Sequence, residues 1–444
     1  MYPRLFQNLI FPALDRLNGT RIHAIGRFLS QCESMSRAEL EALQQEKLSR
    51  TFETVRRESA FYQRFWDTAP EERRASSLYP ELDGLPLVGK EDLRAALDTF
   101  PLPSCRGKVI RANTSGSTGK PMVYLRSAEQ ESWFWALRLR MWRWAGWEPG
   151  EPYMAINLNR RDAWKKKLQD RLFRCTYKTF NRQNIRAQEL VDLLASRRIV
   201  HINAFGSSLL ALAQYMHANG IANPGVRALT STGDNLFAPQ RQLIEDVFGV
   251  PVTDYYGAGG EGVHLASQCE KHGRYHLHLE NAVIEVLKDD RPARPGEVGR
   301  IVVTQLDNAA MPLMRYDLGD LATVCADEPC ACGRPHPATV EAINGRACDL
   351  VLTPAGGVLL PQFFFIGAFK MLEKVESYQI VQDRVESITI KLVAEPGCDR
   401  AGSEASLRQE IERATEGSLA VDFEWVDHIP LAGIGKPRPV VSNL

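Results

Sequence analysis

The stretch Thr114-Ser115-Gly116-Ser117-Thr118-Gly119-Lys120-Pro121 is the most informative part of this sequence. Small residues let a backbone approach phosphate oxygens, hydroxyl and N–H groups can point at those oxygens, and a lysine adds positive charge. The loop of P-loop ATPases needs about four residues between its glycines and Ser or Thr after its lysine. Here only Ser117 and Thr118 separate the glycines, and proline follows the lysine, so that class is excluded. A polar hairpin turn remains the alternative to a phosphate loop.

Around this octet the sequence alternates between strand and helix patterns. We expect helices over residues 36–61, 128–144, 190–196, 208–219, 240–248 and 404–415. We expect strands over residues 109–112, 199–205, 226–230, 252–255, 282–287, 300–305, 320–324, 377–381, 387–393 and 421–426. Strands that alternate with helices of this length predict parallel βαβ units in the middle of the chain, and a β-rich region follows them.

The length indicates more than one domain, because 444 residues exceed what a single ordinary core contains. We predict an α/β protein with a large N-terminal domain over residues 1–345. It combines parallel-sheet subdomains and their helices with a β subdomain, including an insert at about residues 262–335. A small α+β domain is expected over residues 346–444, after a boundary near Gly345-Arg346.

The charge balance and the hydropathy pattern exclude several classes of partner. Lys+Arg and Asp+Glu both number 54, so the chain has no global field that would attract nucleic acid. The N-terminal apolar stretch is interrupted by polar residues, and no later segment offers the roughly 18 uncharged apolar residues that span a bilayer. We therefore expect a cytoplasmic protein with mostly reduced cysteines, in which a cysteine cluster suggests a metal or catalysis.

Several motifs that follow the octet in order carry a family resemblance. These are Ser231-Thr232-Gly233-Asp234-Asn235, Tyr255-Tyr256-Gly257 through Glu261, Arg315-Tyr316-Asp317-Leu318-Gly319-Asp320, Gly345-Arg346 and Gly435-Lys436. Together with the octet they resemble the signatures of the adenylate-forming superfamily, which includes acyl-CoA synthetases, luciferases and peptide-synthetase adenylation domains. The best match is the phenylacetate–CoA ligase branch, particularly its relatives from capsule polysaccharide loci.

The resemblance implies a site that binds ATP and Mg²⁺. Lys436, Glu261 and Lys120 would be the catalytic groups, with Glu261 holding Mg²⁺ and Lys436 reaching the reacting carboxylate and the α-phosphate. Asp320 would bind the ribose. The further nucleotide contacts implied are Thr114, Ser115, Gly116, Ser117, Thr118, Gly119, Gly233, Asp234, Asn235, Tyr256, Gly257 and Arg346.

Two departures from the family pattern affect these assignments. The segment from Tyr256 to Glu261 is one residue longer than the usual Tyr-Gly-x-x-Glu, which leaves open where the glutamate lies relative to the strand. The hinge, which often reads Gly-Arg-x-Asp-Asp, has Cys348 before Asp349 here, so either residue is a candidate pivot for a C-terminal lid.

A cluster of cysteines and histidines suggests a metal site. Three cysteines and one histidine form a closed tetrahedral zinc shell, although the tight Cys330-Ala331-Cys332 spacing also fits free buried cysteines. Relatives of phenylacetate–CoA ligase carry a similar pattern that binds zinc. The resemblance implies Cys269, His276, Cys330 and Cys332 as ligands of a structural Zn²⁺, with His272 as the competing histidine.

The resemblance also implies an acyl pocket beside the adenylate. Its expected walls are Trp133 or Phe134 together with Ala204, Phe205 and Gly206, and Ala204 and Phe205 favour an apolar or aromatic acid. The expected activity is ATP-dependent formation of an acyl-AMP with release of pyrophosphate, followed by transfer, most simply to coenzyme A.

The sequence leaves two other functions open. One is an amide- or ester-forming ligase that modifies a sugar or polysaccharide precursor without coenzyme A. The other is a nucleotide-binding protein without catalysis. The expected partners are a small carboxylic acid, ATP and an acyl acceptor, and homodimers are common among phenylacetate–CoA ligases.

Overall fold

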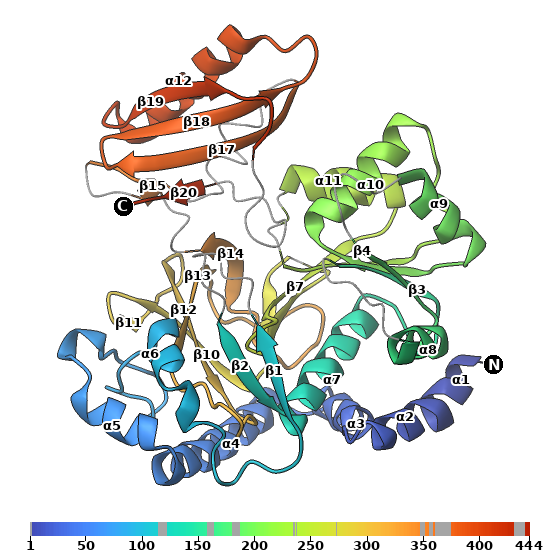
Figure 1. Cartoon of the computed structure of the whole chain (residues 1–444), viewed down its shortest axis with the longest axis vertical. Helices are drawn as coiled ribbons and strands as arrows, with labels where there is room; N and C mark the ends of the chain where they lie inside the picture. The colour runs from blue at the N-terminus through green and yellow to red at the C-terminus, as the bar shows by residue number, and fades with distance from the viewer. Residues whose placement is uncertain are drawn as a thin grey trace.

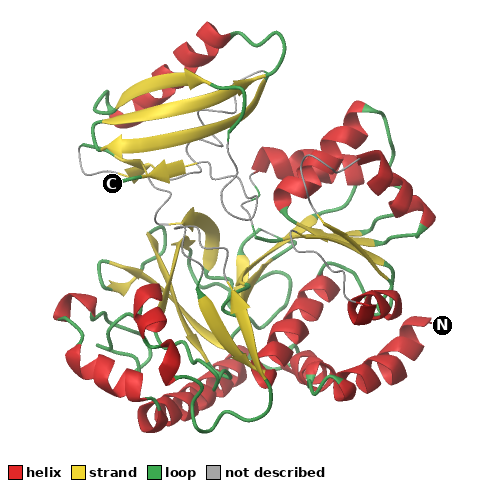
Figure 2. Ribbon diagram, viewed as in Figure 1, coloured by secondary structure: helices red, strands yellow, loops and turns green. Residues whose placement is uncertain are grey.

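The computed structural model of the chain describes residues 2–113, 122–157, 164–179, 187–233, 236, 238–271, 273–346, 351–354, 358–359, 374–429 and 440–444. Within these residues the largest element is a mixed sheet of 12 strands (Figures 1 and 2). In order across the sheet, the strands are β11 (Arg291–Pro292), β10 (Ala282–Lys288), β12 (Val298–Gln305), β13 (Tyr316–Val324), β14 (Val340–Arg346), β9 (Tyr275–Leu277), β8 (Val263–Gln268), β7 (Val252–Ala258), β6 (Ala228–Ser231), β5 (His201–Ala204), β3 (Tyr153–Asn157) and β4 (Cys175–Thr179).

One end of this sheet is parallel and covered on both faces. Strands β4, β3, β5, β6 and β7 run parallel, as the alternating pattern predicts. Met154 and Ile156 on β3 pack into a core with α9 (Ala187–Ser196), α10 (Gly206–Ala218) and α11 (Ala238–Phe248). The intervening Tyr153 and Ala155 pack with Trp142 of α7 (Ala128–Trp144) on the opposite face, because successive strand side chains alternate. A further helix, α8 (Trp164–Leu172), connects β3 to β4.

The sheet changes from parallel to antiparallel pairing at β7. It pairs in parallel with β6 and antiparallel with β8, and every pairing from β8 to β11 is antiparallel. The register between β7 and β8 shifts between Tyr256 and Gly257, which marks a bulge. The turn that follows this bulge contains Glu261.

The N-terminal helices contact both parts of the sheet: Leu40 shares a core with antiparallel strands, whereas Phe6 packs against Phe173, which follows α8 beside the parallel strands. They are α1 (Tyr2–Leu5), the π-helix η1 (Phe6–Ile10), α2 (Phe11–Leu17), α3 (Ile22–Cys32), α4 (Arg37–Glu58), α5 (Ala60–Thr68) and α6 (Lys90–Ala95), with short 3₁₀ turns η2 (Glu71–Arg73) and η3 (Leu97–Thr99). The capping box of Ser36 and Glu39 begins α4 as predicted. A single helix over 36–61 is wrong, because Ser59 leaves the helical conformation and its side chain accepts a hydrogen bond from Tyr62 N at the start of α5.

A two-stranded hairpin flanks the octet. Strand β1 (Val109–Asn113) pairs antiparallel with β2 (Val123–Ser127), and the pairing ends with Asn113 opposite Val123. Residues 114–121 therefore connect two paired strands. They lie outside the described residues, so the structure gives no geometry for the octet itself.

The C-terminal part contains a separate four-stranded sheet (orange to red in Figure 1). Its order is β19 (Ala420–Trp425), β18 (Ser387–Ala394), β17 (Val375–Arg384) and β20 (Val440–Ser442), and α12 (Arg400–Thr415) shares a core with it. A short pair, β15 (Val351–Leu352) and β16 (Val358–Leu359), adds to this core. Of the helices in the described part of the chain, none combines the length and apolarity that a bilayer crossing requires.

Candidate functional site

The end of β7 and the turn that leads to β8 hold three of the predicted site residues, Tyr256, Gly257 and Glu261. Only glycine fits at position 257, because a Cβ atom there would lie 2.5 Å from Val263 O and 2.8 Å from His264 Nδ1. The turn closes with Gly262 N donating to Ala258 O at 2.9 Å. The backbone oxygen of Glu261 accepts a hydrogen bond from Gln305 Nε2 at 2.9 Å, which ties the extended turn to β12. The longer motif is thus accommodated by a bulge and a glycine-rich turn.

Strand β13 brings Asp320 to Tyr256. The Tyr256 hydroxyl donates to Asp320 Oδ2 at 2.7 Å, so two predicted nucleotide-binding residues from distant motifs are in contact. Gly319 has a φ of +73°, a conformation that glycine adopts without strain, and its N–H donates to Asp317 Oδ1 at 2.8 Å. Asp320 also lies directly opposite Arg346 in the β13–β14 pairing.

Tyr124 joins the octet's flanking strand to both of these motifs. Its buried hydroxyl lies 2.7 Å from the hydroxyl of Tyr316 and hydrogen-bonds with the Glu261 carboxyl. Burial raises the pKa of Glu261 above its ordinary value, and the negative charge of Asp320 adds to this, while the Tyr124 hydroxyl and Lys90 oppose it. A cation bound beside this carboxyl would remove the cost of ionising it.

The carboxyl ends of the parallel strands gather at the same edge. Ala204 at the end of β5 pairs with Ser231 at the end of β6, and Thr232 N donates to Ala204 O at 3.2 Å. Gly233 follows with a φ of +81°. Phe205 and Gly206 lie at the start of α10, directly after β5. Ligands of open α/β sheets bind at this edge.

A buried polar chain runs beneath that edge. Asn203 Oδ1 accepts hydrogen bonds from the Tyr255 hydroxyl at 2.8 Å and from Thr230 Oγ1 at 3.0 Å. His201 Nε2 lies 2.8 Å from Thr230 Oγ1. Burial lowers the pKa of His201 to about 3, so its ring is neutral at physiological pH. This chain fixes the Tyr255 ring on one face of β7, opposite the face of Tyr256.

The two predicted pocket residues on α7 diverge in the structure. Phe134 stacks on His264 with ring centres 4.2 Å apart. Trp133 points instead toward the N-terminal helices, where it packs against Phe28 and under the Lys47 ammonium group at 4.0 Å. It lines a cavity of about 330 Å³ between α3, α4 and α7. Adjacent helical residues are rotated by about 100°, so these two side chains line different spaces.

The remaining predicted residues are not placed. Those that lie outside the described residues are Thr114, Ser115, Gly116, Ser117, Thr118, Gly119, Lys120, Asp234, Asn235, His272, Cys348, Asp349 and Lys436. Arg346 ends β14, and its backbone alone is described. Their roles stay predictions.

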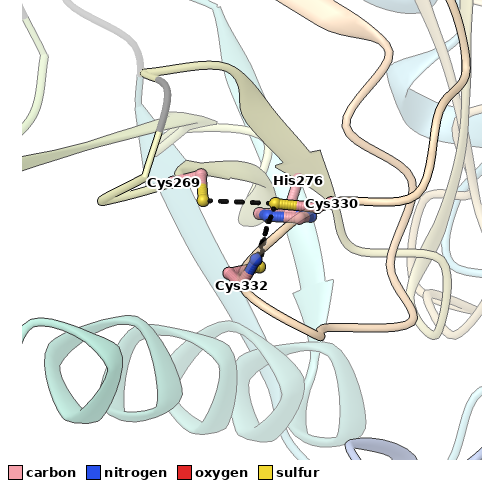
Figure 3. A group of neighbouring side chains, drawn as sticks. All are labelled: Cys269, His276, Cys330 and Cys332. Atoms are coloured by element: carbon pink, nitrogen blue, oxygen red, sulfur yellow. Dashed lines mark hydrogen bonds between the residues drawn. The ribbon is translucent and has the colours of Figure 1, made fainter.

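The four predicted metal ligands converge. Cys269, His276, Cys330 and Cys332 each offer a ligand atom, and these atoms all lie within 4.8 Å of one another (Figure 3). Cys269 Sγ lies 3.5 Å from Cys330 Sγ, and Cys332 Sγ lies 3.3 Å from His276 Nε2. Ligands of a tetrahedral zinc ion with bonds of about 2.3 Å would lie about 3.8 Å apart, close to these separations.

Groups around the cluster orient its ligands. His276 Nδ1 lies 2.8 Å from the backbone oxygen of His336, so that nitrogen carries the proton and Nε2 is left to coordinate. Backbone N–H groups point at the sulfur atoms: Lys271 N at Cys269 (3.4 Å) and Cys332 N at Cys330 (3.4 Å). The donor set, its spacing and its surroundings fit a closed structural site.

Comparisons with known proteins agree with this geometry. A family model described as the CapK C-terminal domain matches residues 351–443. A phenylacetate–coenzyme A ligase of Thermus thermophilus is 26% identical over 407 residues, covering 86% of this chain and 88% of that protein. Protein CapK of Staphylococcus aureus is 24% identical, and the match covers 82% of this chain and 80% of that protein.

A comparison with solved structures also finds a CoA ligase. A crystal structure of a 2-hydroxyisobutyryl-CoA ligase in the postadenylation state superposes with a TM-score of 0.70 at 18% identity, covering 93% of this chain and 92% of that one. Over most of its length the chain is therefore similar to phenylacetate–coenzyme A ligases and to protein CapK, and it shares the fold of this CoA ligase. The CapK-type C-terminal domain corresponds to the region that contains β15 to β20 and α12.

The structure also adds residues that the sequence motifs did not assign to the site. Tyr124, Arg138 and His264 lie beside the predicted site, as described above and below. Tyr124 could have been found from its position three residues after the octet. Arg138 and His264 carry no local signal, because only the packing of α7 on β8 brings them together.

Proposed function

We propose that this chain joins a carboxylic acid to coenzyme A through an acyl-AMP intermediate. In the first step a carboxylate oxygen attacks the α-phosphorus of ATP, the bond to the bridging oxygen breaks, and pyrophosphate leaves. In the second step the thiol sulfur of coenzyme A attacks the acyl carbon, AMP leaves, and the thiol proton passes to solvent. Both steps require positioning and charge neutralisation more than covalent help from the protein.

The observation that carries this proposal is the meeting of three motifs around Glu261. The Tyr124 hydroxyl hydrogen-bonds with Glu261, and the Tyr256 hydroxyl donates to Asp320 at 2.7 Å. The octet begins and ends on the hairpin that carries Tyr124. A nucleotide bound here would have its phosphates near the hairpin and its ribose near Asp320, with Mg²⁺ at Glu261 neutralising phosphate charge. Lys436 would contact the α-phosphate.

Pyrophosphate release with a panel of carboxylic acids tests the first step. We expect release that depends on an acid and on Mg²⁺, and that falls at least about a hundredfold in Lys436→Ala, since electrostatic groups of this kind contribute that much. Coenzyme A should then turn acyl-AMP into a thioester and free AMP. Adenylation of an acid without any thioester, together with AMP release driven by an amine or a sugar, would redirect the second step to the amide- or ester-forming alternative. Absence of pyrophosphate release with every acid would contradict the proposal.

We also propose that Cys269, His276, Cys330 and Cys332 hold a structural zinc ion. Support comes from the convergence of three sulfur atoms and one imidazole nitrogen, and from the hydrogen bond that leaves His276 Nε2 unprotonated. Four protein ligands leave no open position, so no catalytic role follows. Metal analysis of the purified protein should find one zinc per chain, and a protein that folds normally without stoichiometric metal would contradict the assignment.

A further inference from the structure

His264 is a buried side chain that lacks any hydrogen-bond partner within the described part of the chain. It is only 3% exposed, and neither Nδ1 nor Nε2 is paired. The ring lies against the β7 backbone, since a Cβ atom built on Gly257 would come within 2.8 Å of Nδ1. A neutral imidazole always has one donor and one acceptor nitrogen, and leaving both unpaired in a core is costly. Such a group indicates a ligand atom that the protein alone does not supply.

Two aromatic rings contact His264. Phe134 stacks on the ring with centres 4.2 Å apart and planes inclined by 16°. Tyr255 meets the same ring edge-on, with centres 5.4 Å apart. Tyr255 is itself held through its hydroxyl by Asn203. A flat apolar group that binds beside these rings would be favoured by ring contacts.

Arg138 brings a positive charge to the same rings. Its guanidinium carbon lies 5.0 Å from the ring centre of Phe134, 5.0 Å from that of Trp135 and 6.0 Å from that of Tyr255. No carboxylate in the described residues forms an ion pair with it, and its buried Nε has no hydrogen-bond partner. Desolvation by these rings strengthens its attraction for an anion.

Neighbouring arginines are paired, which sets Arg138 apart. On the same helix, Arg140 forms an ion pair with Glu280, and Arg143 forms one with Glu148 at 3.4 Å. Arg126, on the other side of the cluster, pairs with Glu131 at 3.2 Å and donates to Gly259 O at 3.3 Å. The contact with Gly259 places the cluster directly behind the turn that carries Glu261. The unmatched charge is therefore local to the proposed site.

We infer that Arg138 and His264 determine specificity by binding a second acidic group on the acid substrate, so that the preferred substrates are flat dicarboxylic acids. This inference rests on the proposed function. Arg138 would pair with the second carboxylate, His264 would donate a hydrogen bond to it, and Phe134 and Tyr255 would border the apolar body. The first carboxylate would remain free to react at the site near Glu261. A site with buried polar groups discriminates strongly against analogues that leave those groups unpaired.

Matched acids test the inference. We would compare benzoate with benzene-1,3- and benzene-1,4-dicarboxylate in pyrophosphate release by the wild-type enzyme, Arg138→Met and His264→Phe. We expect kcat/KM to be at least about tenfold higher for a dicarboxylate in the wild type, and that preference to disappear or invert in Arg138→Met. Arg143→Met is the matched control, because it removes an exposed arginine from the same helix, and it should keep the preference.

A binding measurement separates this inference from the proposed function. Thermal unfolding with each acid alone should show stabilisation by a dicarboxylate in the wild type and in Arg143→Met, but not in Arg138→Met. Equal use of benzoate and the dicarboxylates by the wild type would overturn the inference while leaving acid activation intact, and so would an unchanged preference in Arg138→Met. Stabilisation that depends on Arg138, without pyrophosphate release from any acid, would support the binding role and contradict the proposed function. The absence of both stabilisation and discrimination would overturn the inference.

Discussion

At the scale of single residues, contacts between motifs that are distant in sequence orient the side chains of the candidate site. Tyr256 and Asp320 are 64 positions apart in sequence, yet their side chains share a 2.7 Å hydrogen bond. The bond fixes the direction of the Asp320 carboxylate before any ligand arrives. Such preorganisation lowers the cost of binding.

Tyr256→Phe tests this positioning. The substitution keeps the ring and removes only the hydroxyl, so Asp320 loses the bond that orients it. We expect KM for ATP to rise roughly three- to tenfold, since a hydrogen bond to a charged group contributes about 1.5 kcal/mol, with a smaller change in kcat. Tyr215→Phe, which removes an exposed hydroxyl on α10, is the control. An unchanged KM in Tyr256→Phe would refute the positioning role.

His201 makes a separate prediction about acid stability. Its pKa is about 3 in the folded chain, lowered by burial, and about 6.5 when unfolded. The unfolded state therefore binds an extra proton between these values, and the free energy of unfolding falls as pH drops below about 6.5, by up to about 1.4 kcal/mol per pH unit from this residue. Urea unfolding at pH 7 and pH 5.5 should show a smaller pH-dependent loss in His201→Phe than in the wild type. An identical loss in both would show that another group accounts for it.

At the scale of elements, the sequence predicts types better than it predicts boundaries and faces. Alternating helices and strands from residue 190 to 255 predict a parallel sheet, and β5, β6 and β7 form it. Strands β3 and β4 escape prediction because Trp, Arg and Lys residues surround them and mask their short apolar runs. The break between α4 and α5 is missed because apolar spacing continues through Ser59.

The candidate site, too, could be predicted from the sequence only in part. Motif order predicts that Glu261, Tyr256 and Asp320 belong together, and the four metal ligands follow from residue type and family pattern. The divergence of Trp133 and Phe134 cannot be read locally, since it depends on which face of α7 meets α3 and which meets β8. Sequence reasoning leaves open which of the two residues lines the pocket, and the structure places their side chains on different sides of α7.

The bulge at the end of β7 gives a test at this scale. Gly257→Ala would place a methyl carbon against the backbone oxygen of Val263 and the ring of His264, so β7 and β8 must separate. We expect this variant to lose roughly 1–3 kcal/mol of stability. Gly259→Ala, two residues later in the same turn, meets nothing within 4 Å and should unfold close to the wild type. Similar melting temperatures for the two variants would contradict this account of the bulge.

At the scale of the whole molecule, the proposed metal ligands lie at the two ends of a long segment. Cys269 and Cys330 are 61 positions apart, and the segment between them contains β9 to β13. A metal ion that joins its ends would stabilise much of the antiparallel region, as a covalent cross-link does. If zinc binds there as proposed, we expect the fold to depend on these four residues more than their small number suggests.

Removal of the metal tests whether the stability of the fold depends on the proposed zinc site. Chelation or Cys332→Ser should lower the melting temperature by at least several degrees and release one zinc per chain, because bound structural zinc contributes directly to folding. Cys105→Ser, which changes a free cysteine outside the cluster, should have little effect. A Cys332→Ser protein with wild-type stability and metal content would show that these residues are ordinary buried cysteines.

The buried arginine of the Arg-Tyr-x-x-Gly-Asp motif has a consequence for synthesis of the chain. The Arg315 guanidinium donates to the backbone oxygens of Ala75 (2.6 Å), Leu82 (3.0 Å) and Leu85 (2.7 Å), so residues 75–85 are held by a side chain up to 240 positions later. At about 5–20 residues per second, roughly 10–50 s pass before this arginine is made. Until then the early segment is open to proteases and chaperones. Nascent chains that stop before residue 315 should be cleaved at residues 75–85, and chains that extend well beyond it should resist.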